Sequence, residues 1–98
     1  MEKKQRQKSS RKRKNEVFSE RLDELLFTRG IQNQELAWSI YVSPSTVSRW
    51  RTGYRMPDVY QIVLISSVLR VSSDYLLGIS DDASEIVPKT PIELKKKK

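Results

Sequence analysis

The stretch "VSPSTVSRWRTG", residues 42–53, carries both the start and the stop signals of a short helix. Ser43 is a favourable N-cap residue, and Pro44 at the first helical position gives up only an N–H that would lack a helical partner anyway. Val47 and Trp50, three residues apart, predict the inward edge, and the final glycine predicts the end of the helix. The other side chains are polar and form the outward face. They are expected to be short near the N-terminus of the helix and long further along.

A second short helix is predicted directly before this stretch, at residues 33–39, with Leu36, Ala37 and Ile40 buried. Its start is weakly marked, because glutamine is a poor capping residue. Only residues 40–42 join the two helices. A connection of about three residues forces two helices to cross at a steep angle, which is the helix-turn-helix arrangement.

Three further helices are predicted around this pair. An apolar stripe of helical period begins at residue 17 and predicts the first helix. Gly30, a residue suited to a left-handed C-cap, is expected to end it. Asp58 caps "VYQIVLISSVLR", and Ser72 caps "SDYLL". In the fourth helix the expected core face is Val59, Ile62, Val63, Ile65 and Leu69, with Leu64 and Val68 beyond it as candidate dimer contacts, together with the fifth helix. The prediction is a compact all-α, five-helix domain.

Composition restricts the classes of function. The 98 residues suggest one small domain, and they include neither cysteine nor histidine. Thiolate metal sites, disulfides and the commonest general base are thereby excluded, whereas catalysis by carboxylates alone is not. Because the sequence shows no paired acid and base and no nucleophile constellation, we expect no enzyme, no metal and no cofactor. No apolar run approaches the roughly 18 residues of a membrane span, and no secretory signal is present. We expect a cytoplasmic protein without a membrane partner.

The net charge of +7 is concentrated at the N-terminus. Residues 1–15 are predicted to be a disordered basic arm, residues 16–78 the folded domain, and residues 79–98 a flexible tail. The arm either contacts nucleic acid without sequence preference, through Arg11, Lys12, Arg13 and Lys14, or only solubilises the chain.

Charge and side-chain size within the domain indicate double-stranded DNA as the partner. No acidic residue occurs between Glu35 and Asp58, whereas three arginines do. The second helix of a helix-turn-helix pair can lie in the DNA major groove, and small residues at its N-terminus allow close approach. Serine and threonine hydroxyls can exchange hydrogen bonds with several bases. The N-terminal helix dipole also favours approach to phosphate.

The ordered set "FSERLDELLFTRGI", "NQELAWSIYVSPSTVSRWRTGYRMP" and "DVYQIVLISSVLRVSSDYLLG" resembles the phage lambda repressor/Cro type of helix-turn-helix domain, often called the XRE family. The resemblance covers residues 16–78 without gaps and implies a lambda-repressor-like domain. It also implies a sequence-specific transcriptional regulator, most simply a repressor that binds a palindromic operator as a homodimer. Because the chain leaves little room for a sensing domain, an inducer is expected to act through a separate regulatory protein.

The same resemblance implies a role for particular residues, position by position. The base-contacting positions fall on Pro44, Ser45, Thr46 and Arg49, and Arg49 is the candidate for bidentate recognition of guanine. Ser45 and Thr46 could instead serve only as capping residues, and Arg49 could be simply solvated. The positions that contact the DNA backbone fall on Asn33, Gln34, Ser43, Arg51, Tyr54 and Arg55.

Three positions depart from the family pattern. Tyr41 replaces the turn glycine, so either it adopts a left-handed conformation at a cost of about 1–2 kcal/mol or the turn differs. Arg51 stands where the family often has an acid, and Leu26 stands at the usual partner position. Arg51 is therefore expected to be free, either to contact phosphate or to remain solvated. Trp38 replaces a charged residue and, with Tyr41, predicts an exposed aromatic pair.

That aromatic pair motivates an alternative function of a different class, a protein-interaction or antitoxin-like module that uses a Trp38/Tyr41 surface. A third hypothesis assigns the activity to the basic arm, as unspecific binding to nucleic acid or to an anionic membrane.

Overall fold

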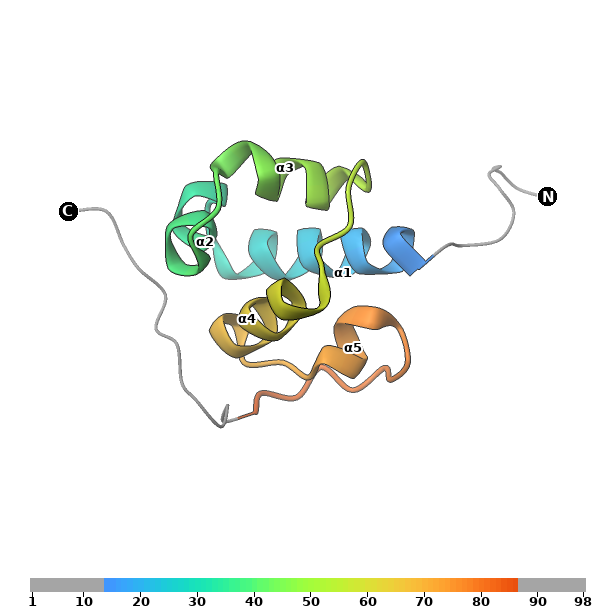
Figure 1. Cartoon of the computed structure of the whole chain (residues 1–98). Coiled ribbons are helices and arrows are strands. Elements are labelled where there is room, and N and C mark those ends of the chain that lie inside the picture. Colours follow the sequence, from blue (N-terminus) through green and yellow to red (C-terminus); the bar gives the residue numbers. More distant parts are fainter. Residues whose placement is uncertain (1–13, 87–98) are drawn as a thin grey trace.

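The computed structural model describes residues 14–86, which form five helices and no strand (Figure 1). The helices are α1 (Lys14–Arg29), α2 (Asn33–Ile40), α3 (Pro44–Thr52), α4 (Val59–Leu69) and α5 (Ser73–Leu77). The predicted all-α class and the order of the five elements are thereby confirmed. Arg11, Lys12 and Arg13 lie outside the described residues, and α1 begins at Lys14, within the range expected for the arm.

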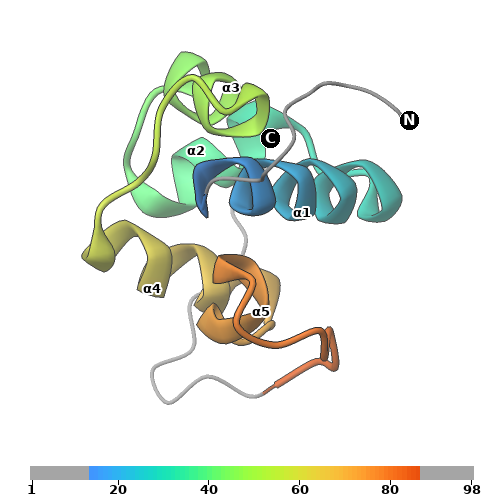
Figure 2. The same cartoon turned by 90° about the vertical axis from the view of Figure 1, so that its right-hand side faces the viewer.

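Helix α1 lies in the middle of the fold, with α3 on one side and α4 and α5 on the other (Figures 1 and 2). It packs against α3 and α5, while α2 packs against α3 and α4. Helix α3 is thus supported from beneath by α1 and α2 and leaves its opposite side at the surface of the molecule.

The core is continuous through all five helices. Trp50 and Val47 of α3 are almost completely buried, as predicted from their spacing. They belong to one cluster with the apolar stripe of α1, with residues of α2, α4 and α5 and with Val71 of the α4–α5 connection; the helical members are Phe18, Leu22, Leu25, Leu26, Leu36, Ala37, Ile40, Ile62, Ile65, Val68, Leu69 and Leu76. The orientation of α3 is therefore fixed by its two large apolar side chains.

The predicted core face of α4 was partly wrong. Val59 is 82% exposed and Val63 is 48% exposed, whereas Val68 is only 8% exposed and belongs to the core. Leu64 is half-buried against the same core. Since α4 is apolar around most of its circumference, its pattern alone does not set its rotation, and packing against α2 and α5 decides which side is buried. Val68 is therefore not available as a dimer contact.

The turn after α2 places Tyr41 in the left-handed region, with φ 64° and ψ 44°. Of the two alternatives for this turn, the structure shows the left-handed conformation. The Val42 N–H donates to the Ala37 carbonyl at 3.0 Å, which closes the helix and directs the chain into α3. At the other end of α2, a Glu35 carboxylate oxygen accepts the Gln32 N–H at 2.9 Å and compensates for the weak N-cap.

Replacing Tyr41 by glycine is expected to make the protein more stable than the Tyr41→Ala variant by about 1 kcal/mol. Both variants lose the aromatic ring, and only alanine keeps the Cβ that disfavours the left-handed conformation. The difference between their free energies of unfolding in urea therefore isolates the backbone strain. Equal stabilities would show that position 41 tolerates a Cβ without cost.

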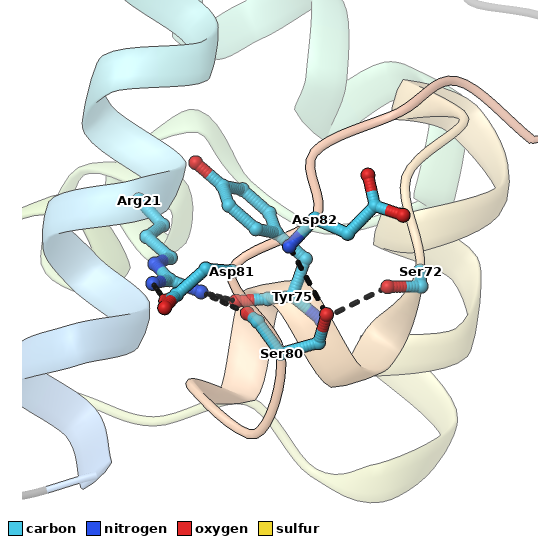
Figure 3. Close-up of polar contacts among 6 residues, drawn as sticks. All are labelled: Arg21, Ser72, Tyr75, Ser80, Asp81 and Asp82. Atoms are coloured by element: carbon cyan, nitrogen blue, oxygen red, sulfur yellow. Dashed lines mark hydrogen bonds and ion pairs between the residues drawn. The ribbon is translucent and has the colours of Figure 1, made fainter.

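The segment that follows α5 is bound to α1 by one arginine (Figure 3). Arg21 Nη1 donates to the carbonyls of Tyr75 at 2.5 Å and Ser80 at 2.6 Å, and Nη2 contacts Asp81 at 2.6 Å. The guanidinium also lies 4.3 Å from the centre of the Tyr75 ring. Further along, the Ile86 N–H donates to the Arg70 carbonyl at 2.9 Å. Residues 79–86, the first part of the expected tail, therefore have defined contacts with the domain.

Replacing Arg21 by alanine is expected to lower the free energy of unfolding by about 2 kcal/mol, because two backbone carbonyls lose a charged donor. Asp81→Asn is the matched control. The Asp81 side chain is 95% exposed, so loss of its ion pair should change stability by less than about 1 kcal/mol. Urea unfolding followed by circular dichroism measures both changes. Equal losses would place the stabilisation in the ion pair instead.

Candidate nucleic-acid interface

Helices α2 and α3 form the predicted helix-turn-helix pair. Residues 41–43 connect the two helices, which lie in close contact. Val42 in this connection is partly buried and packs against the core. Ser43 caps α3 in an extended conformation, and its hydroxyl accepts the Thr46 N–H at 3.2 Å. The capping signals found in the sequence therefore act as predicted, and they bring the start of α3 to the surface beside α2.

The first turn of α3 carries a cluster of hydroxyl groups. Ser43 Oγ lies 3.1 Å from Ser45 Oγ and 2.8 Å from Thr46 Oγ1, both at hydrogen-bond distance. Ser43 and Ser45 are exposed and Thr46 is half-buried. Ser43 is the capping residue, so Ser45 and Thr46 are not needed for that purpose. Their hydroxyls can rotate to donate to, or accept from, a ligand that covers this turn.

The outward face of α3 is exposed as the sequence predicted. Pro44, Ser45, Ser48, Arg49 and Thr52 all have exposed side chains. Within the described part of the chain, the Arg49 guanidinium has neither a hydrogen bond nor an ion pair. Its five N–H donors are thus available to a partner outside the domain.

The chain leaves α3 through a tight turn that returns it toward Arg49. Gly53 has φ 81°, and the Arg49 carbonyl accepts the N–H groups of Tyr54 at 2.9 Å and Arg55 at 3.2 Å. A Cβ on Gly53 would also lie 3.3 Å from Ser19 Oγ, so glycine suits both the conformation and the space. The turn leaves Tyr54 78% exposed and Arg55 exposed.

A surface groove joins these residues. Its lining includes Thr46 and Arg49 of α3, Arg55 of the exit turn and Gln61 of α4. Like Arg49, Arg55 has no side-chain partner among residues 16–86. Two unpaired guanidinium groups and the hydroxyl-bearing turn therefore share one hollow, with no acidic residue in its lining. Such a surface suits an anionic partner that also offers hydrogen-bonding edges.

The predicted role of Arg51 requires correction. Its Nε donates to Asp23 of α1 at 2.7 Å, and its Nη1 donates to Asn33 of α2 at 2.7 Å. The side chain is only 21% exposed. The expectation that Arg51 is free was wrong, because Asp23, one helical turn before Leu26, supplies the acidic partner from a different position of α1.

The start of α2 forms the second part of the surface. Asn33 is half-buried and Gln34 is exposed, and both line an open groove together with Pro44 and Arg51. The start of α2 thus lies beside α3, because Asn33 accepts a hydrogen bond from Arg51 and shares this groove with Pro44. The expected exposed aromatic pair, by contrast, is only partly present, since Tyr41 is 80% exposed but Trp38 is half-buried.

Sequence reasoning missed two residues of this region. Asp23 was not recognised because its partner is 28 residues away, and no local pattern links them. Gln61 lines the groove of Arg49 and Arg55, while its side-chain oxygen accepts the Asp58 N–H at 2.9 Å. The Asp-x-x-Gln spacing is a capping-box signal, from which its place at the start of α4 could have been found.

Residues 14–86 contain no group of three or more acidic, histidine or cysteine side chains arranged to hold a metal ion. No helix in that range is long and apolar enough to cross a membrane.

Comparison with known proteins agrees with this geometry. A family model described as helix-turn-helix matches residues 24–76, which include the whole of α2, α3 and α4. The chain is also 32% identical over 61 residues to the HTH-type transcriptional activator BcrR of Enterococcus faecalis. That alignment covers 62% of this chain and 30% of the relative, and no solved structure gives a significant match. The chain belongs to the XRE-type helix-turn-helix family.

Proposed function

We propose that the chain binds a specific double-stranded DNA sequence by placing the exposed face of α3 in the major groove. The observation that carries this proposal is the unpaired Arg49 guanidinium beside the hydroxyl-bearing first turn of α3. An arginine in this situation can make two parallel hydrogen bonds to guanine O6 and N7. The hydroxyls of Ser45 and Thr46 and the ring of Pro44 complete the surface that faces the bases.

The remaining contacts are assigned to the DNA backbone. Arg55 and Tyr54, on the exit turn, are proposed to contact phosphates on one side of α3, and Asn33 and Gln34, at the start of α2, on the other. Ser43 contributes its hydroxyl at the N-terminus of α3, where the helix dipole favours a phosphate. Backbone contacts on both sides fix the orientation of α3 in the groove, so that base contacts can discriminate.

We further propose that the regulator acts as a homodimer on a palindromic operator. One α3 reads only a few base pairs, and two-fold symmetry would place two half-sites about one helical turn, roughly 34 Å, apart. Occupation of a promoter in this way would repress transcription by occlusion. Relief of repression is assigned to a separate regulatory protein, and the protein is proposed to act in the cytoplasm on nucleoid DNA.

Selection from random DNA tests this proposal directly. The purified chain is incubated with duplexes randomised over about 20 base pairs, at about 0.15 M salt, and bound duplexes are sequenced. The expected result is one enriched motif with inverted symmetry and a guanine in each half. Enrichment of an unpaired half-site would refute the homodimer, and absence of any motif would refute specific recognition.

Removal of residues 1–13 is expected to weaken binding to the selected duplex without changing its sequence preference. Each phosphate neutralised by the arm contributes about 0.9 to the slope of log K against log salt, so this slope should fall. Binding isotherms at several salt concentrations measure it, with the selected and a scrambled duplex compared. Loss of the preference itself would show that the arm, and not α3, carries the recognition.

The protein-interaction alternative is the second candidate, and the exposure of Tyr41 favours it. Because Trp38 is half-buried, the two aromatic rings do not offer a fully exposed pair. If the chain selected no DNA motif while Tyr41→Ala abolished capture of one defined protein, this alternative would replace DNA recognition.

A further inference from the structure

We propose that Arg51 is a positioning residue, which orients the Asn33 side-chain amide so that its NH2 group faces a DNA phosphate. This inference rests on the proposed function and deepens it. It assigns Arg51 a role different from the phosphate contact expected from the sequence. It also gives Asp23, a residue of α1 outside the DNA-facing surface, a part in the same arrangement.

Arg51 joins three helices through one guanidinium. Nε donates to Asp23 of α1, and Nη1 donates to Asn33 Oδ1 of α2, each at 2.7 Å. Asp23 is 54% exposed, whereas the Arg51 side chain is only 21% exposed. The ion pair holds the guanidinium plane, and the plane in turn determines where the second donor points.

The hydrogen bond fixes the orientation of the Asn33 amide. Arginine has only donors, so the Asn33 atom that faces it must be the oxygen. The NH2 group is then the other branch of the planar amide and does not face the guanidinium. Among residues 16–86 this NH2 group has no hydrogen-bond partner. Both of its N–H donors are therefore available, whereas a free asparagine would present oxygen and nitrogen with similar frequency.

The position of Asn33 suits an anionic ligand. Asn33 is the first residue of α2, where backbone N–H groups and the helix dipole favour negative charge. It lines the open groove shared with Gln34 and Pro44, beside the face of α3 assigned to the bases. An amide held with its donors outward is complementary to a phosphate, and one with its oxygen outward would repel it.

Direct contact between Arg51 and phosphate is the competing role, and the geometry argues against it. Two of the donor directions of Arg51 are used within the domain, and most of its surface is covered. Arg49 and Arg55 differ in both respects, since their side chains are exposed and have no partner among residues 16–86.

A double-mutant cycle on the full chain separates these roles. Affinity for the selected duplex is measured for Asn33→Ala, Arg51→Met and the double variant, at a temperature where circular dichroism shows each protein folded. Arg51→Ala is examined in parallel in case Arg51→Met does not fold. Arg55→Met is the matched control, because it removes the same charge from an exposed position without contacting Asn33.

Asn33→Ala is expected to weaken binding about tenfold, since a hydrogen bond to a charged phosphate is lost. Arg51→Met should weaken binding about fivefold in the presence of Asn33 but less than twofold in its absence. Arg55→Met should weaken binding by the same factor in both backgrounds. Asn33→Asp should keep the bond to Arg51, and therefore the fold, while weakening binding at least as much as Asn33→Ala.

Two results would overturn the inference. Equal effects of Arg51→Met in both backgrounds would show that Arg51 acts independently of Asn33. Unchanged affinity of Asn33→Ala would show that Asn33 contacts no phosphate. Either result, combined with weakened binding by Arg55→Met, leaves recognition of DNA by the exposed face of α3 intact, and the second result removes only Asn33 from the proposed backbone contacts. Failure of the unmodified chain to bind the duplex would instead refute the proposed function.

Discussion

Replacing Trp50 by alanine is expected to lower the free energy of unfolding by about 3–5 kcal/mol. Trp50 is 1% exposed and is among the largest fully buried side chains in the described core. It attaches α3 to α1 and α2, so its loss leaves a cavity beneath the helix proposed to enter the groove. A small domain has a total stability near the lower end of about 5–15 kcal/mol, and most of it would be lost. Urea unfolding followed by circular dichroism measures the change.

Trp38→Ala is the matched control for this substitution. Trp38 is half-buried on α2, so removal of its ring should cost less than about 2 kcal/mol. DNA binding by Trp50→Ala should fall in proportion to the folded fraction, because no base contact is assigned to Trp50. If both tryptophan variants were equally stable, α3 would not depend on Trp50 for its position.

The start and end of α3 could be predicted because local chemistry determines them. Ser43 caps the helix with its own hydroxyl, Pro44 occupies the first position, and Gly53 supplies the left-handed residue that ends it. None of these roles depends on distant parts of the chain. The inward placement of Val47 and Trp50 followed from helical period alone, and it left the same polar face exposed that the structure shows.

The buried side of α4 could not be predicted in the same way. Residues 59–69 include no charged side chain, so the apolar pattern gives no contrast between faces. Tertiary contacts determine the buried side. Ser66 is buried and its hydroxyl accepts a hydrogen bond from the Ser73 hydroxyl of α5, while Val59 and Tyr60 remain exposed. A helix with a clear polar stripe, such as α3, does not have this ambiguity.

The pairing of Arg51 illustrates a different limit. Arg51 replaces the family's usual acid, and Leu26 replaces the usual basic partner. The side chain was therefore expected to be free, because only that partner position was considered. In the folded chain Asp23 and Asn33 lie within reach from two other helices. Long side chains reach several positions of a neighbouring helix, so a substituted ion pair can re-form elsewhere. That Arg49 and Arg55 have no partner within the described domain is likewise visible only in the folded geometry.

Replacing Arg49 by alanine is expected to relax recognition at one base position of each half-site while the fold is retained. Loss of a bidentate arginine–guanine contact should reduce discrimination at that position by about 5-fold to 150-fold, corresponding to about 1–3 kcal/mol. Stability should change little, because the Arg49 side chain is exposed and has no partner in the described domain. Affinities for the selected duplex and its single-base variants measure the effect.

Arg55→Ala is the matched control for Arg49→Ala, since Arg55 lines the same groove but is assigned to phosphate. It should weaken binding to the selected and substituted duplexes by one common factor and lower the salt slope by about 0.9. Arg49→Ala should instead weaken binding to the selected duplex most and make the variants at one position equivalent. If both substitutions weakened all duplexes equally, α3 would bind DNA without reading its bases through Arg49.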